Sequence, residues 1–193
     1  MNLSHPIDTT VLADYWLGVL SGPDAESVEA HLFECDQCGA RLREVVALSE
    51  GIRRLARQGD LRMVVSDAFV QRAAEDGLRV REYAPPSGGS VQCTATEDDD
   101  LVMGRLAANL SGARRIDLCL CDEQGVERLR LLDIPFRADA PSVVLQESIS
   151  WMKASPTGMQ IARLLAVDDT GAERLLGEFT FHHTRTLPGQ GAW

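Results

Sequence analysis

The residues with the clearest chemical potential lie in the stretch AHLFECDQCGARL, residues 30–42, which holds one histidine and two cysteines. His31, Cys35 and Cys38 form a His-x-x-x-Cys-x-x-Cys array, and this spacing places all three side chains on one side of a helix or of a helix-turn-helix corner. Imidazole and thiolate groups favour zinc. If the two cysteines lie in the first turn of a helix, its dipole and free N–H groups favour the deprotonated thiols that bind metal. We therefore predict a zinc site.

A closed zinc site needs a fourth protein ligand, which the array does not supply. His5 is the only other histidine or cysteine before residues 84–90, so an N-terminal arm folded across the first helix could complete the site. The alternative is that His31 lies near the C-terminal dipole of a helix and that the cysteines are small buried apolar side chains. A site with four protein ligands has no open position for water, which indicates a structural metal.

The segment APPSGGS, residues 84–90, divides the chain, because its prolines cannot continue a helix and its glycines leave the backbone free. Apolar residues recur at helical spacing before it, and short apolar runs alternate with turn signals after it. We expect an α+β protein with a small helical domain over residues 1–82, a linker over 83–90 and an antiparallel β-sandwich over 91–193.

About four helices are expected in the helical domain. The first begins behind a cap at Asp8, the second begins at Pro23, and a long third helix starts around residues 35–38 and ends at Gly59. The fourth, over about residues 66–77, has a small apolar face. We expect it to be anchored only weakly to the other three.

The expected β domain contains two similar segments, DLCLCDEQGVERLRL and RLLAVDDTGAERLLG, which align Asp122 with Asp168 and Gly125 with Gly171. They predict two hairpins with glycine in the left-handed position of a bulge, and they arise either independently or by repetition. Leu118 and its alternate neighbours should occupy one face of a central strand. We interpret the cysteines of this domain either as buried apolar residues or as a redox switch; they are Cys93, Cys119 and Cys121.

Composition narrows the function classes. The net charge of -10 and the pI near 4.8 oppose contact with phosphate backbones, so direct binding of nucleic acid is disfavoured. No apolar run approaches the roughly 18 residues that cross a bilayer, and the N-terminus lacks the basic and apolar regions of a signal peptide. We expect a cytoplasmic protein without membrane contact. No phosphate loop or nucleophile elbow is present, so we do not expect an enzyme.

Residues 1 to about 80 resemble the zinc-binding anti-sigma factor domain. The signature of that family is the same His-x-x-x-Cys-x-x-Cys array at the corner of its second and third helices, and His5 matches its N-terminal fourth ligand by position. The resemblance implies that the helical domain binds an alternative sigma factor of the extracytoplasmic-function type, is held between its two domains and excludes core RNA polymerase. Some members carry a C-terminal cupin with a His and Glu metal cluster. Here the last two histidines, His182 and His183, are adjacent and point to opposite faces of a strand, so they form a poor ligand pair.

The segment around the fourth helix is the expected partner surface. An apolar surface with nothing to pack on is a candidate partner site, and a negative protein is steered toward the basic surfaces of a DNA-binding partner. The residues concerned are Met63, Val64, Val65, Phe69, Val70 and Leu78. Their alternative role is ordinary packing within the helical domain.

A second function class remains open: a ligand-binding or enzymatic β-sandwich that is anchored by zinc-bound helices. A buried polar pocket in the sandwich, lined by His182 or His183 together with an Asp or Glu, would favour it.

Overall fold

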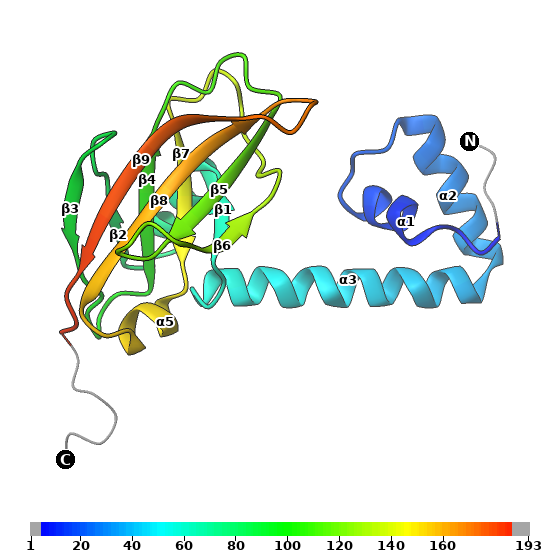
Figure 1. The fold of residues 1–193 in the computed structure, drawn as a ribbon. Coiled ribbons are helices and arrows are strands. Elements are labelled where there is room, and N and C mark those ends of the chain that lie inside the picture. The colour runs from blue at the N-terminus through cyan, green and yellow to red at the C-terminus, as the bar shows by residue number, and fades with distance from the viewer. Residues whose placement is uncertain (1–4, 187–193) are drawn as a thin grey trace. The chain divides into compact units, whose positions relative to one another are not determined.

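The computed structural model describes residues 5–186, and the chain divides into two compact units (Figure 1). The first unit, residues 1–55, is helical, and the second, residues 56–193, is built on two β-sheets. The expected α+β class is confirmed. Among the described residues, no helix is both long enough and apolar enough to cross a membrane.

The helical unit forms where the sequence signals predict it. Asp8 caps the first helix by accepting a hydrogen bond from the N–H of Thr10, and Ser21 caps the second, with Pro23 in its first turn. Its helices are α1 (Thr9–Trp16), α2 (Gly22–Glu34) and α3 (Asp36–Arg57), which reaches just past the boundary at residue 55.

The core of the helical unit is small. Ile7, Leu12, Val28 and Cys38 are each at most 1% exposed and pack together, with half-buried neighbours around them. One of the four is a cysteine of the predicted metal site, so the metal site and the apolar core are adjacent.

The β unit contains nine strands and two helices within the described residues. They are β1 (Met63–Val65), α4 (Asp67–Glu75), β2 (Val80–Tyr83), β3 (Ser90–Cys93), β4 (Leu101–Ala107), β5 (Arg115–Cys121), β6 (Glu127–Leu131), β7 (Ser142–Glu147), α5 (Ile149–Ala154), β8 (Gly158–Val167) and β9 (Glu173–His183).

The strands form two mixed sheets, in the orders β1-β7-β4-β2 and β3-β9-β8-β5-β6. The expectation of a purely antiparallel sandwich was wrong in this detail, because β2 is parallel to β4 and β3 is parallel to β9. Between β2 and β4 the chain visits the other sheet to form β3. This excursion frees β2 and β4 from the antiparallel pairing that a short hairpin imposes.

The two sheets pack face to face over one apolar core. Leu106 and Leu145 contribute to it from the first sheet, and Leu118, Leu164 and Phe179 contribute from the second; all five are at most 2% exposed. The alternate residues of β5, Cys119 and Cys121, are buried on the other face of their sheet. Both faces of β5 are therefore buried and mostly apolar, as predicted for a central strand, with Asp117 as the one buried charged residue on the face of the cysteines.

The segment 63–83 belongs to the β unit, although we expected residues up to 82 to complete the helical domain. Val65 of β1 is paired with Val144 of β7, and β2 is paired with β4. The apolar face of α4 packs, through Ala73 and its neighbours, on Met103 and Val144. The units divide between residues 55 and 56, and not at the expected linker over 83–90. The prediction assigned α4 to the helical domain. In the structure, the small apolar face of this helix packs instead on the sheet that contains β4 and β7.

The two similar segments form similar hairpins. Asp122 and Asp168 each accept hydrogen bonds through Oδ1 from backbone N–H groups two and four residues later. Gly125 and Gly171 adopt φ values of 77° and 84°, the left-handed conformation that glycine reaches without steric cost. The predicted turn chemistry is confirmed at both sites.

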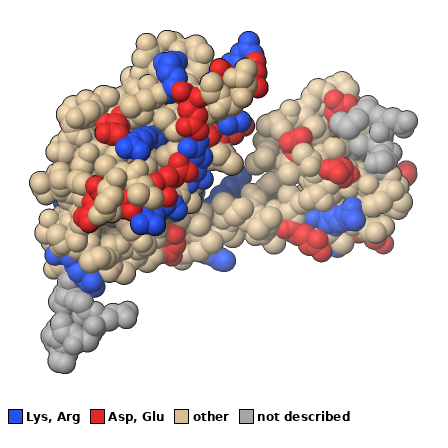
Figure 2. All heavy atoms as spheres, in the orientation of Figure 1, with Lys and Arg blue, Asp and Glu red and all other residues tan. Residues whose placement is uncertain are grey.

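Charged side chains of both signs are interspersed on the β unit. On the face that Figure 2 shows, acidic and basic groups lie side by side over this unit. Arg105, for example, pairs with Glu82 at 2.8 Å and with Asp67 at 2.7 Å. Such partly exposed pairs contribute little to stability, and they divide the surface into small areas of either sign.

Candidate metal centre

Four potential metal ligands converge in the helical unit. His5 precedes α1, His31 lies in α2, Cys35 lies at the corner between α2 and α3, and Cys38 lies in the first turn of α3. One ligand atom from each lies within 4.8 Å of those of the other three, and together they could hold a metal ion. The structure thus brings together the four predicted ligands: the three residues that were named from their spacing, and the N-terminal His5.

The local fold explains this convergence. Helix α2 ends at Glu34, Cys35 is extended with φ -128° and ψ 98°, and α3 begins at the next residue. This one-residue break turns the chain while it keeps His31 and Cys38 close together.

The N-terminal arm is held at the corner by contacts of its own. Ile7 is 1% exposed, and its N–H donates to Sγ of Cys38 at 3.4 Å. Arg41 donates from Nη1 to the carbonyl oxygen of Ile7, also at 3.4 Å. These contacts bring the preceding His5 to the cysteines, with its Nδ1 3.8 Å from Sγ of Cys35.

Two of the four donor groups, Cys35 and His31, are in a state that suits zinc. The pKa of the Cys35 thiol is lowered, chiefly because the backbone N–H of Cys38 donates a hydrogen bond to the sulfur. Nε2 of His31 is buried and has no hydrogen-bond partner in the structure, so a nitrogen donor is available where the other ligand atoms meet. All five cysteines are free thiols. Two sulfurs and two imidazole nitrogens form a donor set typical of zinc.

The expected partner residues belong to the β unit and not to the helical unit. Met63, Phe69, Val70 and Leu78 are half-buried and pack against the core of the β unit, and Val65 is 9% exposed within it. Val64 packs on the central core of the sandwich. The free apolar surface that suggested a partner site is therefore covered by the β unit itself.

The β unit contains a second group of chemically active residues. His183 is buried and His182 is half-buried on β9, and His183 lines a cavity together with Glu147. Sequence reasoning named the histidine pair but missed Glu147. Its signal was a charged residue at the end of SVVLQE, which is otherwise an apolar strand.

Comparison with known proteins agrees with the metal centre and extends no further along the chain. No curated protein matches the sequence. Residues 10–39 match the family model described as "Putative zinc-finger", and this segment includes His31, Cys35 and Cys38 but begins after His5. Residues 10–39 are therefore similar to a zinc-finger family that is found in anti-sigma factors.

Proposed function

We propose that this protein is an anti-sigma factor. Its helical unit binds an alternative sigma factor of the extracytoplasmic-function type and keeps it from core RNA polymerase, in the cytoplasm and without direct contact with nucleic acid. The observation that carries the proposal is the convergence of His5, His31, Cys35 and Cys38 within a segment whose family occurs in anti-sigma factors. A regulatory role is favoured over an enzymatic one, because four protein ligands leave no open position on a zinc ion.

Zinc would act here through shape. The four side chains would hold the ion, and the ion would link the arm before α1 to the corner between α2 and α3. Ile7 would fix the same arm to the helices, because it packs in the core beside Cys38. Structural zinc sites stabilise such small domains directly.

In place of the segment around α4, we propose that the surface which binds the sigma factor lies on the helical unit. Leu48, Ile52 and Leu55 follow one another at helical spacing on α3 and are 67%, 47% and 40% exposed. We call this set the α3 row. A contiguous row of exposed apolar side chains is typical of a surface that a helical partner covers. The net charge of -10 would favour approach to a partner with basic DNA-binding surfaces.

The proposal is tested by co-purification of the full chain with each alternative sigma factor of its own cell. We expect one of them to form a stable complex and to lose its transcription activity in a reconstituted polymerase assay. Leu48→Arg and Ile52→Arg should weaken the complex at least about tenfold, because each buries an unpaired charge in the interface. Leu132→Arg, at an equally exposed apolar residue of the β unit, is the control. If no sigma factor binds the zinc-loaded chain, the proposal fails.

A further inference from the structure

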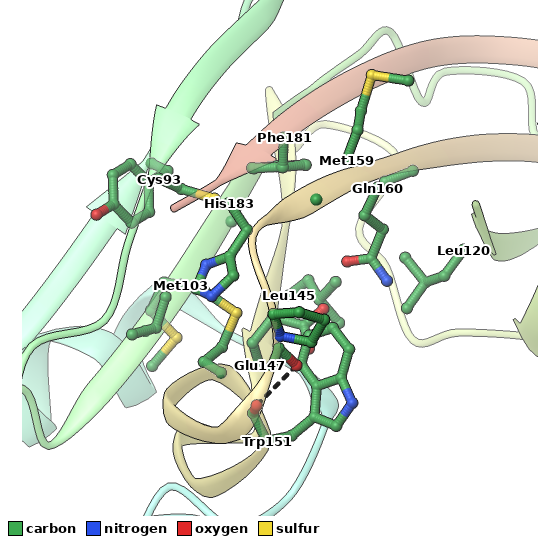
Figure 3. A pocket seen from close by; sticks show the side chains of 18 residues that line it. Cys93, Met103, Leu120, Leu145, Glu147, Trp151, Met159, Gln160, Phe181 and His183 are labelled. Atoms are coloured by element: carbon green, nitrogen blue, oxygen red, sulfur yellow. Dashed lines mark hydrogen bonds between the residues drawn. The ribbon is translucent and has the colours of Figure 1, made fainter. Parts of the chain in front are cut away.

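The β unit contains a cavity between its two sheets, near α5. Its volume is about 210 Å³, and most of its wall is apolar. Gly104 lines it opposite Phe181, and a Cβ atom at this glycine would lie 3.2 Å from Cζ of the ring, so the glycine leaves room for the aromatic wall. Figure 3 shows the cavity and the side chains around it. Four of them matter for ligand binding: Glu147, Met152, Met159 and His183.

Two of these side chains are buried with polar atoms that have no hydrogen-bond partner in the structure. His183 is 9% exposed, and although its ring interacts with the backbone of Ser155 and of Met152, neither ring nitrogen makes a hydrogen bond of good geometry. Glu147 is 7% exposed, and its Oε2 accepts from Nε of Arg62 at 2.6 Å while Oε1 has no partner. The buried Asp117 differs, because its two oxygens accept from the N–H of Asp133 and from Arg130. Buried polar atoms in native proteins are nearly always paired, so unpaired atoms at a cavity wall indicate a partner that arrives from outside the chain.

The chemistry of these atoms limits the kind of ligand. Burial lowers the pKa of His183, so its imidazole is neutral at neutral pH and offers one donor and one acceptor nitrogen. Oε1 of Glu147 can accept a hydrogen bond, while Arg62 already balances the charge of the carboxylate. A charged ligand would therefore remain unpaired inside an apolar cavity. A metal ion is disfavoured, because within residues 5–186 the one cluster of three or more His, Cys, Asp and Glu side chains close enough to hold it is the N-terminal one.

We propose that this cavity binds a small, neutral, largely apolar compound whose single N–H or O–H group donates to the acceptor nitrogen of His183, with Glu147 Oε1 as a second acceptor lining the same cavity. The size of the ligand follows from the volume. An apolar cavity of about 150 Å³ accommodates benzene, so a cavity of about 210 Å³ suits a compound of bicyclic size. This binding is independent of the helical unit and of the sigma factor proposed above.

The test uses the full zinc-loaded chain and two probes of the same shape, indole and indene, of which only indole has an N–H donor. Isothermal titration calorimetry should show that indole binds about tenfold or more tightly than indene, as expected for one hydrogen bond to a buried acceptor. Methyl signals of [methyl-¹³C]methionine place the probe. Met152 and Met159 line the cavity and should shift on addition of indole, whereas Met63 does not line it and should stay unchanged.

Matched variants on one strand separate the cavity from the surface. His183→Phe should lower the affinity for indole about tenfold and reduce the difference between the two probes. His182→Phe alters the neighbouring residue, which does not line the cavity, and should leave both affinities unchanged. Equal affinity for indole and indene, or indole shifts at Met63 without shifts at Met152 and Met159, would overturn the proposal. The wild-type measurements decide the question even if His183→Phe fails to fold.

Discussion

Replacement of Cys38 by serine should unfold the helical unit and leave the β unit folded. Cys38 is fully buried in a core whose other completely enclosed side chains are Ile7, Leu12 and Val28. At about 1.5–3 kcal/mol each, these three aliphatic side chains provide at most about 9 kcal/mol of burial free energy. A structural zinc ion contributes about 10–16 kcal/mol of folding free energy in small domains. The folding free energy from the metal is as large as the whole net stability of an ordinary domain, about 5–15 kcal/mol. Without the metal, the helical unit should therefore unfold.

Cys119→Ser is the matched control for this prediction. Cys119 is 1% exposed and is packed in the β unit, far along the chain from the metal centre, so the same change of sulfur to oxygen is made in a buried site without metal. We expect about one zinc per chain in the wild type and in Cys119→Ser, and none in Cys38→Ser, by mass spectrometry of the metal.

Hydrogen exchange then localises the effect. In Cys38→Ser, and in the wild type treated with a chelator, amides of α1 and α2 should exchange rapidly, including the N–H of Ile7 that donates to the Cys38 sulfur. Amides of β5 and β8 should stay protected. The reasoning is refuted if Cys38→Ser loses its zinc and still protects α1 and α2 as well as Cys119→Ser does.

Three further outcomes follow from single residues. Burial lowers the pKa of His183 below its ordinary 6.5, so near this pH the unfolded chain binds more protons at His183 than the folded chain does. Urea denaturation should therefore show that the β unit loses stability as the pH falls below 6.5, by up to about 1.4 kcal/mol per pH unit. His183→Phe should remove this dependence. Burial shields Cys93 and raises its pKa to about 11, so in chelator-treated protein iodoacetamide should label Cys35 and Cys38 of the unfolded helical unit long before Cys93, as peptide mass spectrometry would show. Gly59→Ala should lower the melting temperature more than Gly77→Ala; both have positive φ, which costs about 1–2 kcal/mol, but a Cβ at Gly59 would also lie 2.5 Å from a backbone carbonyl oxygen.

The metal centre was predictable because, in a helix, the spacing of residues along the sequence determines which side of the helix they share. Three residues at i, i+4 and i+7 must share one side of a helical corner, and the structure places His31, Cys35 and Cys38 there. His5 was named because the segment before residue 84 offers no other histidine or cysteine and because it matches by position the N-terminal ligand of the zinc-binding anti-sigma factor domain. Its position depends on Ile7, whose burial beside Cys38 no local pattern announces.

The domain boundary was not predictable from local patterns. Met63–Val65 is a strand of three residues, too short to be told from a loop by alternation, and it becomes a strand by pairing with β7. Once this strand was missed, α4 could only be assigned to the helices before it. The cavity was hidden for a related reason: Glu147 and His183 belong to different sheets and meet only through the packing of the sandwich.

The order β1-β7-β4-β2 has a practical consequence for anyone who divides this protein. Both outer strands of that sheet come from residues 63–83, ahead of the proline-rich segment that looks like a natural place to cut. A fragment that begins at Ala84 would lack both strands and leave the backbone N–H and C=O groups of β7 and β4 open on two sides. Such open edges pair with strands from other molecules, so the shortened protein should precipitate or form fibres instead of behaving as an isolated β-sandwich.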